Sequence, residues 1–169
     1  MKIEPFYTER LKIRSMKLSD AEFAIKNWND EEAGKYMIDE KYESANHLRF
    51  LLIGMDEWED IYMLTAEDKN SKETVGTCCI GKEDGKIWSI GYTVDKDKWN
   101  RNYGTEIVKA LVTFAIKNNI NILEAEVAKA NTASKRVLEK CGFKIYKESS
   151  FQKRKTDIIH PSYIYRLVI

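Results

Sequence analysis

The fold is decided by residues 87–117, IWSIGYTVDKDKWNRNYGTEIVKALVTFAIK, and by the segments that follow, ILEAEV (122–127) and NTASKRVLEKCG (131–142). Residues 87–94 and 122–127 have the composition of strands, and residues 105–117 and 131–141 have helical spacing. A strand that passes through a full helix into the next strand predicts a parallel pair with a right-handed crossover.

Residues 95–104 form a polar loop rich in lysine and asparagine, directly before the first of these helices. Backbone N–H groups that converge on a helix start, with the positive end of the helix dipole behind them, bind phosphate or pyrophosphate. The same loop also fits an ordinary strand–turn–helix connection that binds nothing. Taken alone, the loop leaves both interpretations open.

The rest of the chain predicts antiparallel strands and a group of early helices. Strands are expected at 10–14, 61–67, 74–81, 143–147 and 158–168, and helices at 19–29 and about 45–56, with a further short helix at 31–37. Charged segments at 68–72 and 82–86 predict hairpin turns, with Gly85 suited to a positive φ. The expected fold class is α/β with a mixed (α+β) sheet, in the order β-α-α-β-β-β-α-β-α-β-β, within one domain that spans residues 1–169.

Composition and charge limit the classes of function. Of the 169 residues, 43% are hydrophobic and 33% are charged, which is the balance of a soluble globular protein. The formal net charge of +1 argues against nucleic acid as the main partner. The N-terminal segment lacks the apolar stretch of a signal peptide, and the longest apolar run, 50–54, is too short to span a bilayer. We expect a cytoplasmic protein with no membrane partner.

The cysteines and histidines do not have the spacing of metal ligands. Cys78, Cys79 and Cys141 lack a CxxC pattern, and His47 and His160 are far apart in the sequence. We therefore expect reduced core thiols and no metal. The alternative to a structural role for all three cysteines is that one of them is catalytic.

Four segments in this order resemble the GCN5-related N-acetyltransferase (GNAT) superfamily. They are Thr8–Leu11 with Arg14; Ile90–Tyr92 leading to Asn102–Glu106; Asn131 with Ser134; and Leu138–Phe143. The resemblance covers nearly the whole chain and looks closest to the branch of ribosomal-protein N-terminal alanine acetyltransferases. It implies acetyl-CoA as the cosubstrate and a central parallel pair of strands that splays apart to form a slot for it.

The resemblance places the two ends of acetyl-CoA on different elements. The pantetheine amides would pair with strand backbone between 92–94 and 125–127, as an added half-strand does. In the family, the pyrophosphate loop reads Gln/Arg-x-x-Gly-x-Gly/Ala, and this chain has Trp99, Asn102 and Gly104 at the three fixed positions. Asparagine tolerates the left-handed conformation that glycine adopts in such a loop. The residues expected at the cosubstrate are Tyr92, Thr93, Val94, Trp99, Asn100, Arg101, Asn102, Tyr103, Gly104 and Thr105.

The helix after the second strand completes the expected cosubstrate site. Asn131 stands at the N-cap position, and the equivalent asparagine in the family also contacts the pantetheine arm. Lys135 and Arg136 lie one turn further on. They either contact the 3′-phosphate of the adenosine or form a solvated basic face.

The catalytic residues implied by the resemblance differ from those of many family members. These carry a tyrosine, which protonates the departing CoA thiolate, where this chain has Leu138. The alanine-acetyltransferase branch instead has a serine three residues after the asparagine, and Ser134 fits that position. Ser134 either serves as the general acid or only bonds to local backbone at the helix start. Candidates for the base are Glu126, which could equally be a surface carboxylate, Glu106 and Asp157.

The expected function is acetyl transfer from acetyl-CoA to a primary amine by direct attack in a ternary complex. The acceptor, a peptide N-terminus or a small amine, would lie between 28–45 and 151–163. Acidic residues at 30–32 and 39–40 and basic residues at 153–155 favour an acceptor that carries both charges over a polyamine. A homodimer is left open. The rival function is a catalytically silent CoA-binding regulatory module, favoured by the absent tyrosine and the altered loop glycine.

Overall fold

The computed structural model describes residues 3–54 and 61–169, and within them one sheet of eight strands runs in the order β1-β2-β3-β4-β5-β6-β8-β7. The strands are β1 (Phe6–Tyr7), β2 (Leu11–Ser15), β3 (Ile61–Asp68), β4 (Thr74–Asp84), β5 (Ile87–Val94), β6 (Ile122–Ala128), β7 (Lys144–Gln152) and β8 (Ile159–Val168). The helices are α1 (Ala21–Asn29), α2 (Ala45–Gly54), α3 (Tyr103–Lys117) and α4 (Thr132–Lys140), with short 3₁₀ turns at Leu18–Asp20 and Lys96–Lys98. None of the described helices is long and apolar enough to cross a membrane.

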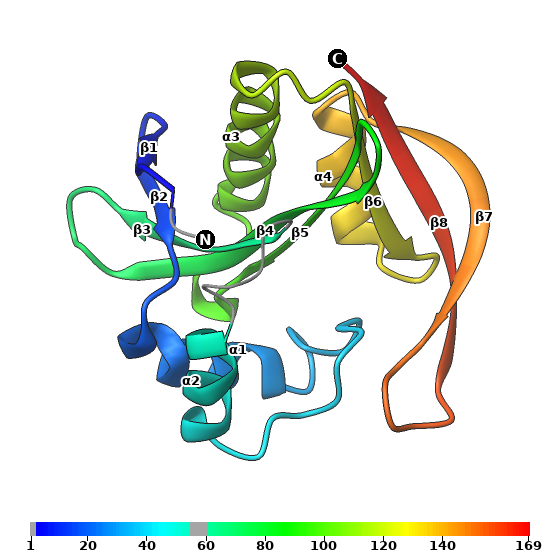
Figure 1. Ribbon diagram of the computed structural model, residues 1–169. Helices are drawn as coiled ribbons and strands as arrows, with labels where there is room; N and C mark the ends of the chain where they lie inside the picture. The colour runs from blue at the N-terminus through cyan, green and yellow to red at the C-terminus, as the bar shows by residue number, and fades with distance from the viewer. Residues whose placement is uncertain (1–2, 55–60) are drawn as a thin grey trace.

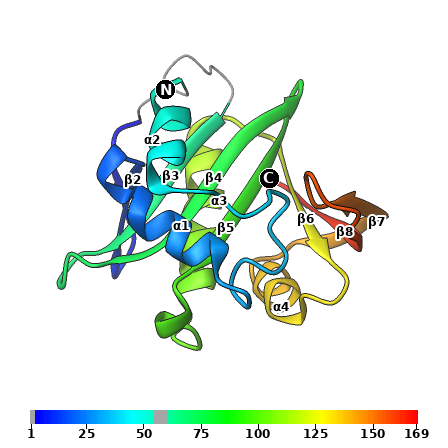
Figure 2. The ribbon, with the colours of Figure 1, turned by 90° about the horizontal axis from the view of Figure 1, so that it is seen from below.

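Helices cover both faces of this sheet. Figure 1 shows α3 and α4 on one side of the central strands and α1 with α2 on the other, and Figure 2 shows α1 crossing the strands from below. The larger core cluster lies between the sheet and α3, around fully buried Leu64, Ile80 and Leu111. The smaller cluster joins α1 to α2 through Trp28 and Leu48. The mixed α/β fold class expected from the sequence is confirmed.

The parallel pair at the centre of the sheet is short. β5 and β6 pair only through Ile87–Ser89 and Ile122–Glu124, whereas every other neighbouring pair of strands is antiparallel. Beyond Glu124, β6 continues to pair with β8 on its other side. Among the described residues, Ile90–Val94 of β5 therefore has no strand partner on the β6 side. The expected splayed pair is present, at the expected residues.

Several expected boundaries were wrong. The short helix expected at 31–37 is a series of turns, because the Asp30 carboxylate accepts the N–H groups of Glu32 and Ala33 at 2.9 and 2.8 Å. Local side-chain bonds of this kind compete with helix formation. The strand expected at 143–147 is longer, since β7 stays paired with β8 up to Gln152.

Other boundaries differ by smaller amounts. The two-residue strand β1 was not expected, and α3 begins two residues earlier than its apolar pattern suggested. Gly85 has a φ of +52°, as the hairpin required, although β4 runs on to Asp84. The expected helix end at 55–56 lies outside the described residues.

Candidate active site

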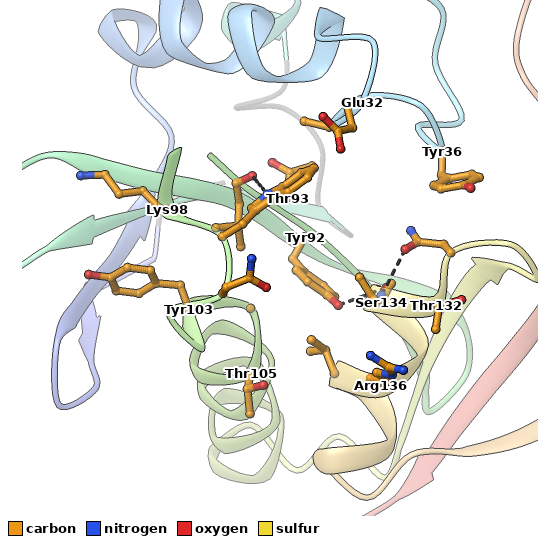
Figure 3. A pocket seen from close by; sticks show the side chains of 18 of the residues that line it. Glu32, Tyr36, Tyr92, Thr93, Lys98, Tyr103, Thr105, Thr132, Ser134 and Arg136 are labelled. Carbon is orange, nitrogen blue, oxygen red and sulfur yellow. Dashed lines mark hydrogen bonds between the residues drawn. The ribbon is translucent and has the colours of Figure 1, made fainter. Parts of the chain in front are cut away.

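A cavity of about 660 Å³ opens where the strands splay apart. It lies between the end of β5, the starts of α3 and α4, and the connection from α1 to α2 (Figure 3). Its lining includes Glu32, Ala33, Lys35, Tyr36, Met37, Tyr92, Thr93, Val94, Lys98, Trp99, Asn100, Asn102, Tyr103, Gly104, Thr105, Ala130, Asn131, Thr132, Ala133, Ser134, Arg136, Val137 and Lys140. The cavity thus brings together most of the residues that the sequence predicted, although they come from three separate segments.

The loop before α3 turns through two left-handed residues. Asn100 and Asn102 have φ values of 60° and 62°, a conformation that asparagine tolerates better than most residues. Asn102 is also the N-cap of α3, and within the described chain its side chain makes no cap hydrogen bond. The first N–H groups of a helix have no intrahelical acceptor. The start of α3 therefore presents backbone donors at the cavity.

Gly104 lies where α3 comes close to its neighbours. A Cβ atom added at Gly104 would lie 3.3 Å from the Tyr92 ring and 3.5 Å from Val137 Cγ2. The first distance is tighter than an ordinary van der Waals contact. Glycine at this position therefore keeps the first turn of α3 close to both β5 and α4, and leaves the cavity open at its backbone.

Trp99 connects this loop to β5 by a hydrogen bond. Its indole Nε1 donates a hydrogen bond to the carbonyl oxygen of Val94 at 2.8 Å. The family pattern has a long polar side chain here, and the indole keeps one donor while it adds apolar surface to the cavity wall. The sequence predicted that Trp99 lies at the site, but it did not predict this hydrogen bond to Val94.

Neighbouring residues of β5 point to opposite faces of the sheet. The Thr93 hydroxyl accepts a bond from Asn27 Nδ2 at 3.0 Å and lies 2.9 Å from the Thr77 hydroxyl, which accepts from the Trp28 indole at 2.9 Å. The Thr93 side chain is therefore tied to both α1 and β4. Trp28, which was expected near the acceptor, is instead 7% exposed in the core of α1 and α2.

The Tyr92 ring projects to the other face and meets the first turn of α4. The Tyr92 hydroxyl lies 3.0 Å from Ser134 Oγ, and Figure 3 shows the two side chains directed toward one another. The Ser134 N–H donates to Asn131 Oδ1 at 3.1 Å, so Asn131 is the N-cap that the sequence predicted. Burial raises the pKa of Tyr92 to about 12, although the hydrogen bond with Ser134 acts in the opposite direction. The Tyr92 hydroxyl is therefore protonated at neutral pH.

The Tyr92 hydroxyl was not expected at the site, because only the backbone of that residue had been assigned a role. A signal was available in the alternation of the strand. Ile90 and Tyr92 share one face, and Ile90 is 6% exposed under the crossover helix. Leu138, the position of the missing tyrosine, is fully buried in the core and brings no hydroxyl to the site.

The structure does not bring every predicted residue to the cavity. Among the described residues, its lining includes neither Arg101 nor Lys135 nor Glu126, whereas it includes Arg136, Lys98 and Lys140. Glu126 is exposed on β6 and accepts the Ser162 hydroxyl at 2.5 Å. Lys98 and Lys140 were missed because a lone lysine has no spacing signal.

The charged runs that were expected to face an acceptor pair with one another instead. Arg154 Nη1 lies 2.8 Å from Asp39 Oδ1, and Lys155 Nζ lies 2.5 Å from Glu40 Oε1. The Arg154 N–H also donates to the Ile38 carbonyl at 2.8 Å. These contacts hold the α1–α2 connection against the β7–β8 hairpin. The charge argument for an acceptor that bridges the two runs therefore loses its basis.

Aromatic side chains accompany these ion pairs. The Tyr36 and His160 rings are 5.6 Å apart, and the Phe151 and His160 rings are 5.2 Å apart. Tyr36 lines the cavity on the side across from α3 (Figure 3). The two segments expected to surround the acceptor are thus in contact beside the cavity.

The comparisons with known proteins agree with this arrangement. The family model described as an acetyltransferase (GNAT) domain matches residues 10–144. The uncharacterized N-acetyltransferase p20 of Bacillus licheniformis is 29% identical over 150 residues, which is 83% of each chain. The chain belongs to the GNAT acetyltransferase family, and it is an N-acetyltransferase.

Solved structures of other acetyltransferases share the fold. Spermidine N-acetyltransferase from Vibrio cholerae, solved with CoA and spermine, has a TM-score of 0.85 at 15% identity, over 95% of this chain and 96% of that one. Ribosomal-protein-S5-alanine acetyltransferase from Vibrio fischeri has a TM-score of 0.79 at 15% identity, over 98% and 97%. At such identities the likeness concerns the fold alone. GNAT enzymes use acetyl-CoA and act on small amines or proteins.

Proposed function

We propose that the cavity binds acetyl-CoA and that the chain transfers its acetyl group to a primary amine by direct attack in a ternary complex. One observation carries the proposal: the open N–H groups of α3, the unpaired edge of β5 and the Ser134 hydroxyl all border the same cavity. The N–H groups of α3 suit a pyrophosphate, and the edge of β5 suits a pantetheine arm. The Ser134 hydroxyl suits the reacting thioester.

The binding roles follow from these positions. The backbone of residues 102–105 holds the pyrophosphate at the positive end of the α3 dipole. The edge of β5 at residues 92–94, which has no described strand partner on the β6 side, holds the pantetheine amides. Arg136 and Lys140, both on α4, line the cavity and suit the phosphate of the adenosine. None of these contacts requires a metal ion.

The chemical roles are divided between two elements. Acetyl-CoA, when bound, supplies the acetyl group as a reactive thioester. A backbone N–H of β5 near Tyr92 stabilises the negative charge that develops on the carbonyl oxygen. Ser134, whose backbone N–H is held by Asn131, gives its hydroxyl proton to the departing CoA thiolate. Water takes the proton from the amine, because Glu126 is not among the described residues that line the cavity.

The acceptor enters between the α1–α2 connection and the β7–β8 hairpin. Tyr36 and Met37 line the cavity on this side, and the nearby carboxylates of Asp39 and Glu40 are already paired with Arg154 and Lys155. A polyamine needs several unpaired carboxylates, whereas a peptide N-terminus or a single small amine needs only one polar contact and an apolar wall. We therefore favour a peptide N-terminus or a small monoamine.

The experiment measures CoA thiol release from acetyl-CoA with a panel of peptides, amino acids and polyamines. We expect turnover with at least one amine and a loss of roughly 10²-fold in kcat for Ser134→Ala, with an unchanged Kd for CoA. Ser149→Ala, on the exposed edge strand β7, is the matched control and should keep the wild-type kcat. Tight CoA binding with no turnover on any amine would instead support the silent regulatory module.

A further inference from the structure

The contact between Tyr92 and Ser134 links two residues that the proposed chemistry treats differently. Ser134 is the proposed proton donor, whereas Tyr92 has so far contributed only its backbone. Their hydroxyl oxygens are 3.0 Å apart, which is the distance of a normal hydrogen bond. A serine hydroxyl has one proton to give, so its other contact decides where that proton points.

A serine hydroxyl is a poor acid when it acts alone. An alkyl hydroxyl is a far weaker acid than a phenol, and a thiol, with a reference pKa of about 8.5, is a stronger acid than either. A serine that protonated a thiolate without replacement would be left as an alkoxide. In this chain the usual tyrosine position holds the buried Leu138. A second hydroxyl next to Ser134 can replace the lost proton and so avoid the alkoxide.

We propose that the Tyr92 hydroxyl donates to Ser134 Oγ, directs the Ser134 proton into the cavity and replaces it during the reaction. Tyr92 is thus a positioning and relay residue that acts through Ser134, and the inference rests on the proposed acetyl transfer. It supplies from β5 the phenol that α4 lacks. The ring is held for this task between Gly104 of α3 and Ser134 of α4.

The protons and bonds balance in this relay. As the amide N–C bond forms and the C–S bond breaks, Ser134 gives its proton to the sulfur, which keeps the electron pair of that bond. The Ser134 oxygen takes the Tyr92 proton at the same time. The proton that the amine loses returns through water to the Tyr92 oxygen. No oxidant, reductant or further reactant is required.

The first test removes the hydroxyl alone. Tyr92→Phe should lower kcat about 10-fold or more and leave the KM and Kd of acetyl-CoA within about twofold of wild type. Tyr165→Phe is the matched control, because the Tyr165 hydroxyl also bonds to a residue of α4, Glu139 at 2.9 Å, but lies outside the cavity lining. It should keep the wild-type kcat.

The second test asks whether the two hydroxyl groups act as one unit. The double variant Tyr92→Phe/Ser134→Ala should be no slower than Ser134→Ala alone, because the relay is already broken. Multiplied losses in the double variant would overturn the relay. So would a wild-type kcat in Tyr92→Phe while Ser134→Ala is slow, and this second result would leave the proposed function intact.

A third measurement does not depend on turnover. The nine tyrosines can be labelled with ¹³C at Cζ, and the Tyr92 signal is identified as the one that Tyr92→Phe removes. We expect CoA and Ser134→Ala each to shift this signal, because both change what the Tyr92 hydroxyl contacts. A Tyr92 signal that responds to neither change would overturn the inference. Absence of turnover in the wild-type protein, with the signal still responding to CoA, would count against the proposed function instead.

Discussion

Arg10 and Glu106 lie 96 residues apart in the chain and are joined at both carboxylate oxygens. Arg10 Nε donates to Glu106 Oε2 at 2.7 Å, and the Arg10 backbone N–H donates to Oε1 at 2.9 Å. The Thr8 hydroxyl also donates to Oε1, so Glu106 has no free oxygen with which to act as the base suggested by the sequence. Burial raises the pKa of Glu106, but the hydrogen bonds from Thr8 and Arg10 outweigh it and lower the pKa below its ordinary value.

The same arginine also contacts the loop before α3. Arg10 Nη2 donates to the Arg101 carbonyl oxygen at 3.0 Å, and its guanidinium lies 4.2 Å from the centre of the Tyr103 ring. This bond occupies the Arg101 carbonyl oxygen and ties the loop to the N-terminal turn. The N-terminal turn and the start of α3 therefore form one unit, and the structure explains why both segments carry the family resemblance.

The first prediction concerns this unit. Arg10→Ala should raise the Kd for CoA about 10-fold, because a charge-assisted hydrogen bond to the loop is lost, and should leave kcat at saturating acetyl-CoA nearly unchanged. Isothermal titration calorimetry measures the first effect. Arg49→Ala, which removes a partly exposed arginine paired with Glu22 at 3.0 Å, is the control. A wild-type Kd in Arg10→Ala would show that the loop keeps its shape without the clamp.

The second prediction concerns the close approach at Gly104. Gly104→Val should abolish the rise in melting temperature that CoA causes in the wild-type protein, because the side chain displaces the Tyr92 ring and covers the first N–H groups of α3. Differential scanning fluorimetry with and without CoA measures it. Gly54→Ala is the control, since nothing described lies within 4 Å of a Cβ added there. An unchanged shift in Gly104→Val would remove the loop from the binding site.

The third prediction concerns acid stability. Buried Asp20 is held by Arg14 Nη1 and Nη2 at 2.6 and 3.0 Å and by the Thr65 hydroxyl at 2.9 Å. Burial raises its pKa, but these bonds outweigh it and lower the pKa below the ordinary value of 3.8. Asp20 therefore stabilises the fold fully above that value, and the contribution disappears as the pH falls through the lowered pKa.

The variant that tests this is Asp20→Asn. It should lower the free energy of unfolding near neutral pH by about 1.5–3 kcal/mol, because Arg14 loses its charge-assisted bonds to Asp20 and keeps Glu67, at 3.2 Å, as a carboxylate partner. It should also flatten the dependence of that free energy on pH below about 3.8, as measured by urea denaturation. Asp84→Asn, at the exposed end of β4, should change the free energy little. Equal acid sensitivity in Asp20→Asn and wild type would assign that sensitivity to other carboxylates.

The fourth prediction concerns the ion pairs beside the acceptor. Arg154→Glu should raise the KM for the amine about two- to fivefold without changing the Kd for CoA, because exposed pairs are each worth less than about 1 kcal/mol. Adding Asp39→Arg restores the pair with reversed charges and should restore the KM. Failure of the second change to rescue the first would show that Arg154 acts on the acceptor directly.

The sequence by itself determined the elements of the site and their order. Helical spacing, the N-cap Asn131 and the left-handed tolerance of Asn102 are local properties, set by residues within four positions of one another. The crossover after β5 has one favoured hand, so the parallel pair and its place in the sheet followed as well. These relations do not depend on how distant segments pack.

Only the tertiary structure decided which distant side chains meet. The Tyr92–Ser134 contact spans 42 positions, and the pairing of Arg154 with Asp39 spans 115. A local pattern says that a residue is polar or exposed, but it does not say which of many polar partners will reach it. That choice depends on the packing of whole elements, because hydrogen bonds and ion pairs form only within about 3–4 Å. For this reason the sequence could place Ser134 at the site, whereas the phenol beside it became visible only in the folded chain.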